Sequence, residues 1–175
     1  MMIISKLPNE SLSGFIPSYN VNAFFFKMNN FLKDYYTADK KQAGNIIQHY
    51  CKAYNINQKL IIATLQKEQG LIEDLGNPRL TVPDIKLLDG ATGCGLLDGG
   101  EVLTKYLGFE NQISGACSTY RHWYNAWKPA MRNVVYDNPE KWVEAGNEIT
   151  YSFLKYTPRL SALKLIEDVY KRYFL

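Results

Sequence analysis

Apolar residues recur every three or four positions along most of this chain, which is the spacing of an amphipathic α-helix and not of a β-strand. The clearest apolar stripe runs from Phe24 to Tyr35. Five further stripes lie at about 39–54, 57–69, 111–127, 139–154 and 160–173. This pattern predicts a mainly α fold.

The interruptions of the helical pattern predict how the chain is divided. Residues 1–18 include Pro8 and Pro17 and predict an irregular N-terminal lead-in. Residues 70–108 are rich in glycine and predict a long loop-rich segment, in which short strands or helical turns can occur. Residues 19–175 then form a single domain, since 46% hydrophobic residues in a chain of 175 suffice for one core.

The charge and the apolar runs exclude several classes of protein. The formal charge is only +3 and both signs are interspersed, so the basic surface of a dedicated nucleic-acid binder is missing. No apolar run approaches the roughly 20 residues of a membrane-spanning helix. Lys6, Pro8 and Glu10 interrupt what would be the apolar core of a signal peptide, so we expect none. We therefore predict no nucleic-acid partner and no transmembrane segment.

The cysteines do not form a metal-binding pattern. Cys51, Cys94 and Cys117 lie far apart, no C-x-x-C pair occurs, and only two histidines accompany them. We predict no metal site. Cys51 lies on the apolar stripe of its helix and is therefore expected to be a small buried hydrophobe.

The helix predicted over 57–69 ends on a carboxylate. Asn57 is a favourable N-cap, and Gly70 is a typical C-terminal stop. Glu68 lies on the last turn, seven residues after Ile61 and three after Leu65, and so on the same side as these apolar residues. A carboxyl group that loses solvation favours its protonated form, as a general acid requires. The spacing alone also allows a bland alternative, in which Glu68 is simply exposed where the helix ends.

Four segments of the chain resemble motifs of one superfamily. Residues 54–71 resemble the opening catalytic motif of lysozyme-like glycosidases and lytic transglycosylases, in the variant whose helix ends Leu-Gln-Lys-Glu-Gln. Residues 91–95 stand where these proteins have a glycine-bounded, sugar-binding turn. Residues 108–116 resemble their Asn-and-Gly helix start, and residues 151–158 resemble their late tyrosine motif. Together the segments cover roughly residues 50–160 in the expected order and imply a lysozyme-like helical domain.

The resemblance implies a function and a set of site residues. Glu68 would be the general acid/base that cleaves the β-1,4 bond between N-acetylmuramic acid and N-acetylglucosamine in peptidoglycan, and no cofactor or metal is implied. The residues that match sugar-binding positions are Gln69, Thr92, Gly93, Gln112 and Tyr156. Aromatic residues on the helix over 111–127, such as Tyr120, are at least as well explained by core packing.

The sequence departs from the common transglycosylase pattern at two places. Gln69 replaces the serine that usually follows the catalytic glutamate, and residues 92–98 replace the usual Gly-Leu-Met-Gln turn. The first change matches the Leu-Gln-Lys-Glu-Gln variant and indicates a subfamily.

A second catalytic carboxylate would decide the products. The candidates are Asp84, Asp89, Asp98 and Glu101. Asp98 is preferred among them because the surrounding glycines let its backbone approach a sugar, although an ordinary turn aspartate that satisfies local N–H groups explains this residue better. With a partner carboxylate or a positioned water the reaction is hydrolysis, as in a muramidase. Without one, Glu68 would turn to the muramyl 6-hydroxyl and leave a 1,6-anhydro end.

The resemblance leaves a second function open and has consequences for delivery. The alternative is a non-catalytic peptidoglycan-binding or structural component of a phage or secretion particle. A wall-cutting enzyme without a signal peptide would remain cytoplasmic until release, or would travel with a virion or secretion particle, whose proteins would be its partners. Because Cys94 and Cys117 fall in neighbouring parts of the implied site, a bridge between them is a further hypothesis.

Overall fold

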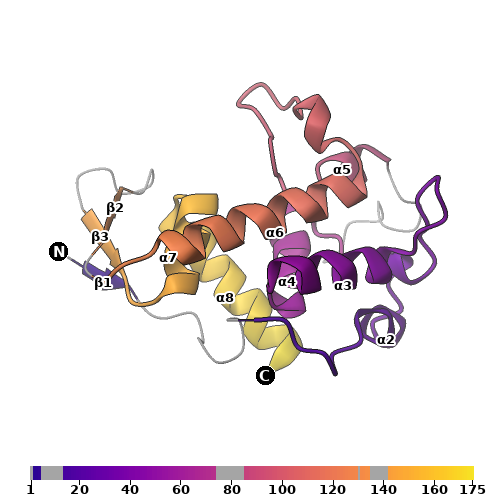
Figure 1. Ribbon diagram of the computed structural model, residues 1–175, viewed down its shortest axis with the longest axis horizontal. Helices are drawn as coiled ribbons and strands as arrows, with labels where there is room; N and C mark the ends of the chain where they lie inside the picture. The colour runs from indigo at the N-terminus through magenta and orange to yellow at the C-terminus, as the bar shows by residue number, and fades with distance from the viewer. Residues whose placement is uncertain (1, 5–13, 74–84, 130, 135–141) are drawn as a thin grey trace.

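The computed structural model describes residues 2–4, 14–73, 85–129, 131–134 and 142–175, and most of these are helical (Figure 1). The α-helices are α2 Val21–Lys27, α3 Ala43–Tyr54, α4 Gln58–Gln69, α5 Ile85–Asp89, α6 Phe109–Ala126, α7 Glu148–Tyr156 and α8 Leu160–Phe174. The remaining elements are the 3-10 helices η1 Phe31–Lys33 and η3 Thr104–Tyr106 and the strands β1 Met2–Ile4, β2 Arg132–Val134 and β3 Trp142–Ala145. The predicted mainly α class is confirmed.

Helix α4 is buried along most of its length. Every residue from Leu60 to Gln66 is buried, so this helix is surrounded by protein on all sides. Figure 1 places α4 between α3, α6 and α8. The Asn57 side chain accepts a hydrogen bond from the Lys59 backbone N–H at 2.9 Å, and Gly70, at φ 63°, ends the helix in a left-handed conformation. Both predicted boundaries are confirmed.

Helix α6 contacts helices from both ends of the chain. It packs against α3 on one side and against α7 on the other (Figure 1). Phe109, Ile113, Cys117 and Tyr120 lie on its inner face, and all four are at most 1% exposed. This is the apolar face that the helical spacing predicted.

The three-stranded sheet corrects two sequence predictions. Its order is β1-β3-β2, with β1 parallel and β2 antiparallel to β3, so the lead-in over 1–18 is not wholly irregular. The helix predicted over 139–154 begins only at Glu148, because the Asn147 side chain caps it by accepting from the Thr150 N–H at 2.9 Å. Val143 and Ala145 are buried while Glu144 is partly exposed, which is the two-residue period of a strand.

The helix predicted over 24–35 is also wrong in extent. Helix α2 ends at Lys27, and Asn29 has a φ of 48°, which a continuing helix does not permit. The Asn30 side chain then accepts from the Leu32 N–H and starts η1. The same side chain donates to the carbonyl of Leu71 at 2.7 Å, so the break ties this segment to the end of α4.

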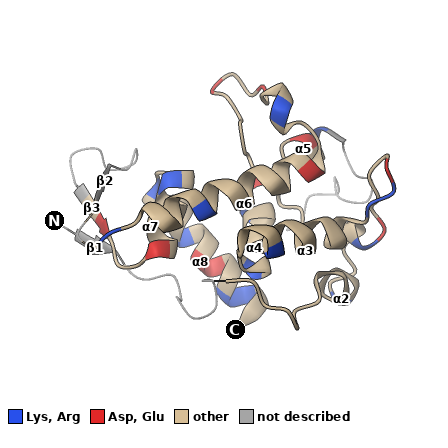
Figure 2. Ribbon diagram, viewed as in Figure 1, with Lys and Arg blue, Asp and Glu red and all other residues tan. Residues whose placement is uncertain are grey.

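The described residues contain no helix that combines the length and apolar character needed to cross a membrane. Figure 2 shows that Lys and Arg share helices and loops with Asp and Glu, as along α8, instead of collecting on one element.

Candidate active site

Glu68 lies on the last turn of α4, where the helix reaches the surface. Its side chain is 23% exposed, so it is neither fully buried on the apolar side of the helix nor freely exposed at the helix end. The Glu68 Oε1 atom accepts a hydrogen bond from Lys67 Nζ and another from Thr157 Oγ1 at 3.4 Å. Lys67 Nζ also donates to Thr157 Oγ1 at 3.0 Å, and the Lys67 side chain is only 5% exposed. Glu68 is therefore positioned by polar contacts, not by an apolar pocket.

The glycine turn predicted at 91–95 lies directly against this carboxylate. Gly93 has a φ of +72°, and a Cβ atom added there would be 3.4 Å from Glu68 Oε2. Oε1 is held by Lys67 and Thr157, so Oε2 is the oxygen that faces the turn. The neighbouring Gln69 donates from Nε2 to the Gly90 carbonyl at 3.1 Å and holds the start of the turn to the end of α4.

Gln112 fixes the same turn from the other side. Its side chain is fully buried, and its Oε1 accepts from the backbone N–H groups of Thr92 and Cys94, both at 3.1 Å, and from Thr92 Oγ1 at 3.0 Å. Its Nε2 donates to the carbonyls of Cys94 at 2.9 Å and Tyr106 at 2.8 Å. One amide side chain on the first turns of α6 therefore satisfies four backbone groups of the loop.

Tyr156, at the end of α7, also holds the turn at 91–95. Its hydroxyl donates to the Thr92 carbonyl at 2.7 Å, and its ring stacks on Tyr120 with centroids 4.6 Å apart and planes at 14°. Burial raises the pKa of the Tyr156 hydroxyl well above its usual range, so this group stays protonated and remains a donor. The Tyr120 hydroxyl is in turn 3.0 Å from Thr64 Oγ1 on α4.

The predicted sugar contacts thus divide into two groups. Gln69, Gly93 and Tyr156 are partly exposed. Thr92 and Gln112 are 0% exposed, so the structure does not bring their side chains to the surface as the predicted direct sugar contacts. Their hydrogen bonds shape the turn instead.

Three residues that the sequence argument missed also belong to this arrangement. Lys67 and Thr157 contact the Glu68 carboxylate, and Thr64 supports the Tyr120 hydroxyl. Thr64 lies four residues before Glu68, so a polar residue one turn earlier on the same helix face was the available signal. Thr157 lies in the 151–158 segment of the late tyrosine motif, but nothing local singled out this residue, because the tertiary fold brings it to Glu68.

Asp98 remains an untested candidate for the second carboxylate. It is exposed in the turn between Leu96 and Val102, which pair as an isolated antiparallel bridge. Among the described residues, no hydrogen bond or ion pair connects Asp98 to Glu68. Asp84 lies outside the described residues. A group of three or more His, Cys, Asp or Glu side chains suited to a metal ion does not occur within the described ranges.

Two cavities lie elsewhere in the molecule. One of about 560 Å³ is lined by residues of the 36–50 region together with Glu110. The other, of about 290 Å³, lies between residues 17–22 and α3. Neither is lined by Glu68, Gly93 or Gln112, so these cavities and the candidate active site are separate features.

Comparison of the chain with protein-family models, curated proteins and solved structures gives no match. The case for a function therefore depends on the residues and geometry described above.

Proposed function

We propose that this chain is a peptidoglycan-cleaving glycosidase that cuts the β-1,4 bond between N-acetylmuramic acid and N-acetylglucosamine, with Glu68 as its general acid/base. The observation that carries the proposal is the convergence of four separate segments. The turn at 91–95 and the end of α7 meet the end of α4 at the Glu68 carboxylate, through Gly93 and Thr157, and the start of α6 holds the same turn through Gln112. These are the segments whose residues resemble the superfamily motifs, and their meeting has no basis in sequence proximity.

The proposed fold is a lysozyme-like helical domain with its loop-rich segment inserted after the catalytic helix. Two features support it. The helix that carries Glu68 is the buried central helix, and the chain that follows it returns to that helix at Gly90 and Gly93 before α6 begins. A loop held by hydrogen bonds on a rigid helical frame is a common way to build a binding surface.

In the proposed reaction, protonated Glu68 donates its proton to the glycosidic oxygen as that bond breaks. Oε2 is the expected donor atom, because Oε1 is held by Lys67 and Thr157. The carboxylate that results then removes a proton from the group that attacks the sugar. If that group is water, the product has a reducing end. If it is the muramyl 6-hydroxyl, the product has a 1,6-anhydro end.

The substrate lies outside the cell membrane, so the proposal includes a route to the wall. Release on lysis, passage through a holin-like pore, and carriage by a virion or secretion particle are the routes consistent with it.

The test is digestion of purified peptidoglycan by the wild-type protein and by Glu68→Gln, with released muropeptides identified by mass spectrometry. A general acid/base contributes roughly 10²–10⁴-fold, so Glu68→Gln is expected to lose at least about a hundredfold of the release rate. Glu167→Gln on α8 is the matched control. Glu167 also pairs with a lysine, Lys171, and its side chain is 24% exposed against 23% for Glu68, yet it lies outside the proposed site.

The products separate the two chemical outcomes. Anhydro-muramyl ends identify a transglycosylase, and Asp98→Asn then leaves the rate unchanged. Reducing ends identify a hydrolase, and in that case loss of activity in Asp98→Asn supports its predicted role as the second carboxylate.

Two results would overturn the proposal. Undiminished release by Glu68→Gln would remove Glu68 from the mechanism. No release by a wild-type protein that has a native circular dichroism spectrum would reject the enzyme, and cosedimentation of that protein with insoluble peptidoglycan would then favour the non-catalytic binding or structural component.

A further inference from the structure

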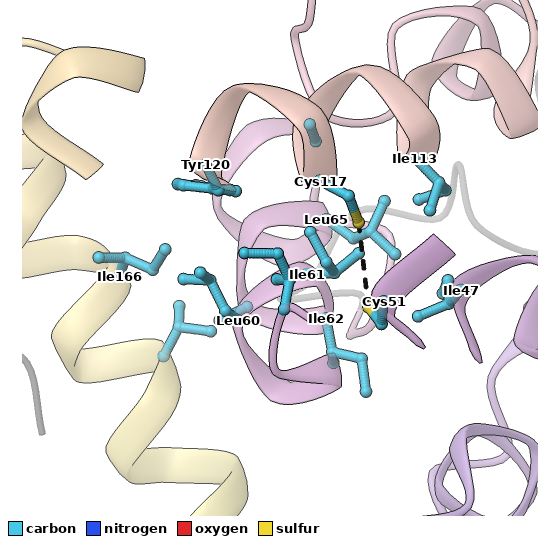
Figure 3. Packing of buried hydrophobic residues seen from close by; sticks show 14 of the residues in the cluster. Ile47, Cys51, Leu60, Ile61, Ile62, Leu65, Ile113, Cys117, Tyr120 and Ile166 are labelled. Atoms are coloured by element: carbon cyan, nitrogen blue, oxygen red, sulfur yellow. Dashed lines mark hydrogen bonds between the residues drawn. The ribbon is translucent and has the colours of Figure 1, made fainter. Parts of the chain in front are cut away.

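The core holds a pair of cysteines that no part of the proposed mechanism uses. Cys51 on α3 and Cys117 on α6 are both 0% exposed, and their sulfur atoms lie 4.0 Å apart. Figure 3 shows the two side chains pointing toward each other across the interface between these helices, beside Leu65 of α4. The structure thus pairs Cys117 with Cys51 and not with Cys94, which corrects the hypothesis of a Cys94–Cys117 bridge.

The geometry is close to that of a covalent link. A disulfide has a sulfur–sulfur bond of about 2.05 Å, so the two sulfur atoms must approach by about 2 Å. Side-chain rotations together with a slight shift of α3 against α6 would have to supply this movement. The surrounding residues are apolar, with Ile47, Leu65 and Ile113 among them, so neither charge nor metal coordination explains why two thiols meet here.

We propose that Cys51 and Cys117 form a disulfide bond when the chain folds in an oxidising environment, with a low-molecular-weight disulfide such as oxidised glutathione as the oxidant. The Cys51 thiolate attacks one glutathione sulfur, forms a mixed disulfide and releases one glutathione thiolate. The Cys117 thiolate then attacks the Cys51 sulfur and releases the second. The two protons lost by the cysteines balance those that the two glutathione thiolates take up.

Burial decides when this bond can form. The apolar surroundings, and then the contact with Cys117, raise the pKa of the Cys51 thiol well above its usual range, so the reactive thiolate is suppressed once the core has closed. Exchange therefore belongs to the unfolded or partly folded chain. After folding, the same burial shields the bond from reductants. The redox state of the folding compartment sets which form is made, and the bond is not a switch that the folded protein can reverse.

The bond would also restrict movement of a helix that supports the candidate active site. It links α3 to α6, and α6 carries Gln112, which holds the 91–95 turn. The inference does not depend on peptidoglycan cleavage, since its measurements need no substrate.

The experiment uses Cys94→Ala, which leaves only the two thiols in question. The protein is unfolded, fully reduced, and refolded either with a mixture of oxidised and reduced glutathione or with reduced glutathione alone. The oxidative sample is expected to lose two hydrogen atoms by intact mass, to show no titratable thiol in denaturant, and to yield one cross-linked peptide containing Cys51 and Cys117. Its melting temperature should exceed that of the reduced sample by roughly 4–16 °C, because the bond closes a loop between residues 66 positions apart.

The comparison is between two redox forms of one polypeptide, so any effect of Cys94→Ala on the fold is common to both samples. Cys51→Ala in the same background is the control and should show neither the mass loss nor the temperature shift. Folded native protein exposed to the same oxidant should keep both thiols. Two thiols still titratable after oxidative refolding, stable glutathione adducts at either position, or an oxidised form without the native circular dichroism spectrum would each overturn the proposal. So would a cross-link that involves Cys94 when the wild-type chain is refolded in the same way.

Discussion

Among the side chains that hold the turn at 91–95, Gln112 should contribute most to stability, so replacing it by leucine should destabilise the protein most. Leucine has nearly the same size and favours a helix, so the change removes polar contacts without leaving a large cavity. The side chain makes five hydrogen bonds, four of them to backbone groups of Thr92, Cys94 and Tyr106. A buried polar group left without its partner costs about 1–3 kcal/mol.

The expected loss is smaller than the sum over these groups. The loop can shift and admit water to part of the vacated positions, so we expect the free energy of unfolding to fall by about 3–5 kcal/mol. For a chain of this length, that corresponds to a melting temperature lower by roughly 6–20 °C. Urea denaturation followed by circular dichroism measures the first quantity, and calorimetry measures the second.

Asn111→Leu is the matched control for Gln112→Leu. Asn111 is the preceding residue on α6, but it is exposed and its side chain makes a single hydrogen bond, to the Leu107 carbonyl at 2.7 Å. Its loss should cost no more than about 1 kcal/mol. If the two variants are equally stable, the hydrogen bonds of Gln112 do not hold the loop. The claim that Gln112 fixes the position of Gly93 beside Glu68 would then be wrong.

Three further predictions concern the surroundings of Glu68. Gly93→Ala and Gly100→Ala both impose a side chain on a glycine of positive φ, at +72° and +83°, and should each cost about 1 kcal/mol in chemical denaturation. Only Gly93→Ala places a Cβ against Glu68 Oε2, so only this variant should slow muropeptide release, by at least roughly tenfold. Tyr156→Phe removes the donor to the Thr92 carbonyl and should lower the free energy of unfolding by about 1 kcal/mol; an unchanged urea midpoint would refute this. Lys67→Met should lower kcat by roughly tenfold with KM unchanged, because it removes a donor from Oε1, and Lys67→Arg should recover part of the loss if a cation is what that oxygen requires.

Local chemistry explains which elements could be predicted from the sequence. The boundaries of α4 follow from Asn57 and Gly70, two residues that act on their own helix. The predicted helix over 24–35 failed because Asn29 adopts a left-handed conformation and Asn30 turns its side chain to carbonyls 41 and 42 residues away. Helical spacing carries no information about such distant partners. The strand Trp142–Ala145 was missed because a segment of four residues is too short for its apolar spacing to distinguish a strand from a helix.

The candidate site shows the same division between local and distant causes. Glu68 was predicted from its place on the last turn of its helix and from the motif that its helix resembles, whereas its contact with Thr157, 89 residues later, arises from the tertiary fold. The motif residues Thr92 and Gln112 were predicted as sugar contacts, whereas their side chains bond the backbone of the turn, since residue identity does not reveal whether a polar side chain faces a ligand or the backbone.

Their burial narrows what a ligand could touch. Among the motif residues, the Thr92 and Gln112 side chains are committed to internal hydrogen bonds, and the Gly93 N–H donates to the Gly90 carbonyl at 2.9 Å. The Gly93 carbonyl accepts from the Leu96 N–H at 3.2 Å, and its second lone pair can accept from a ligand, as can the side-chain oxygen of the partly exposed Gln69. Backbone groups at fixed positions recognise hydroxyl and amide groups of a sugar through geometry, and they lose little conformational entropy on binding. Specificity at this site would then depend on how rigidly Gln112 holds the turn. A variant that loosens the turn should therefore weaken binding of glycan fragments even where Glu68 and every exposed residue are unchanged.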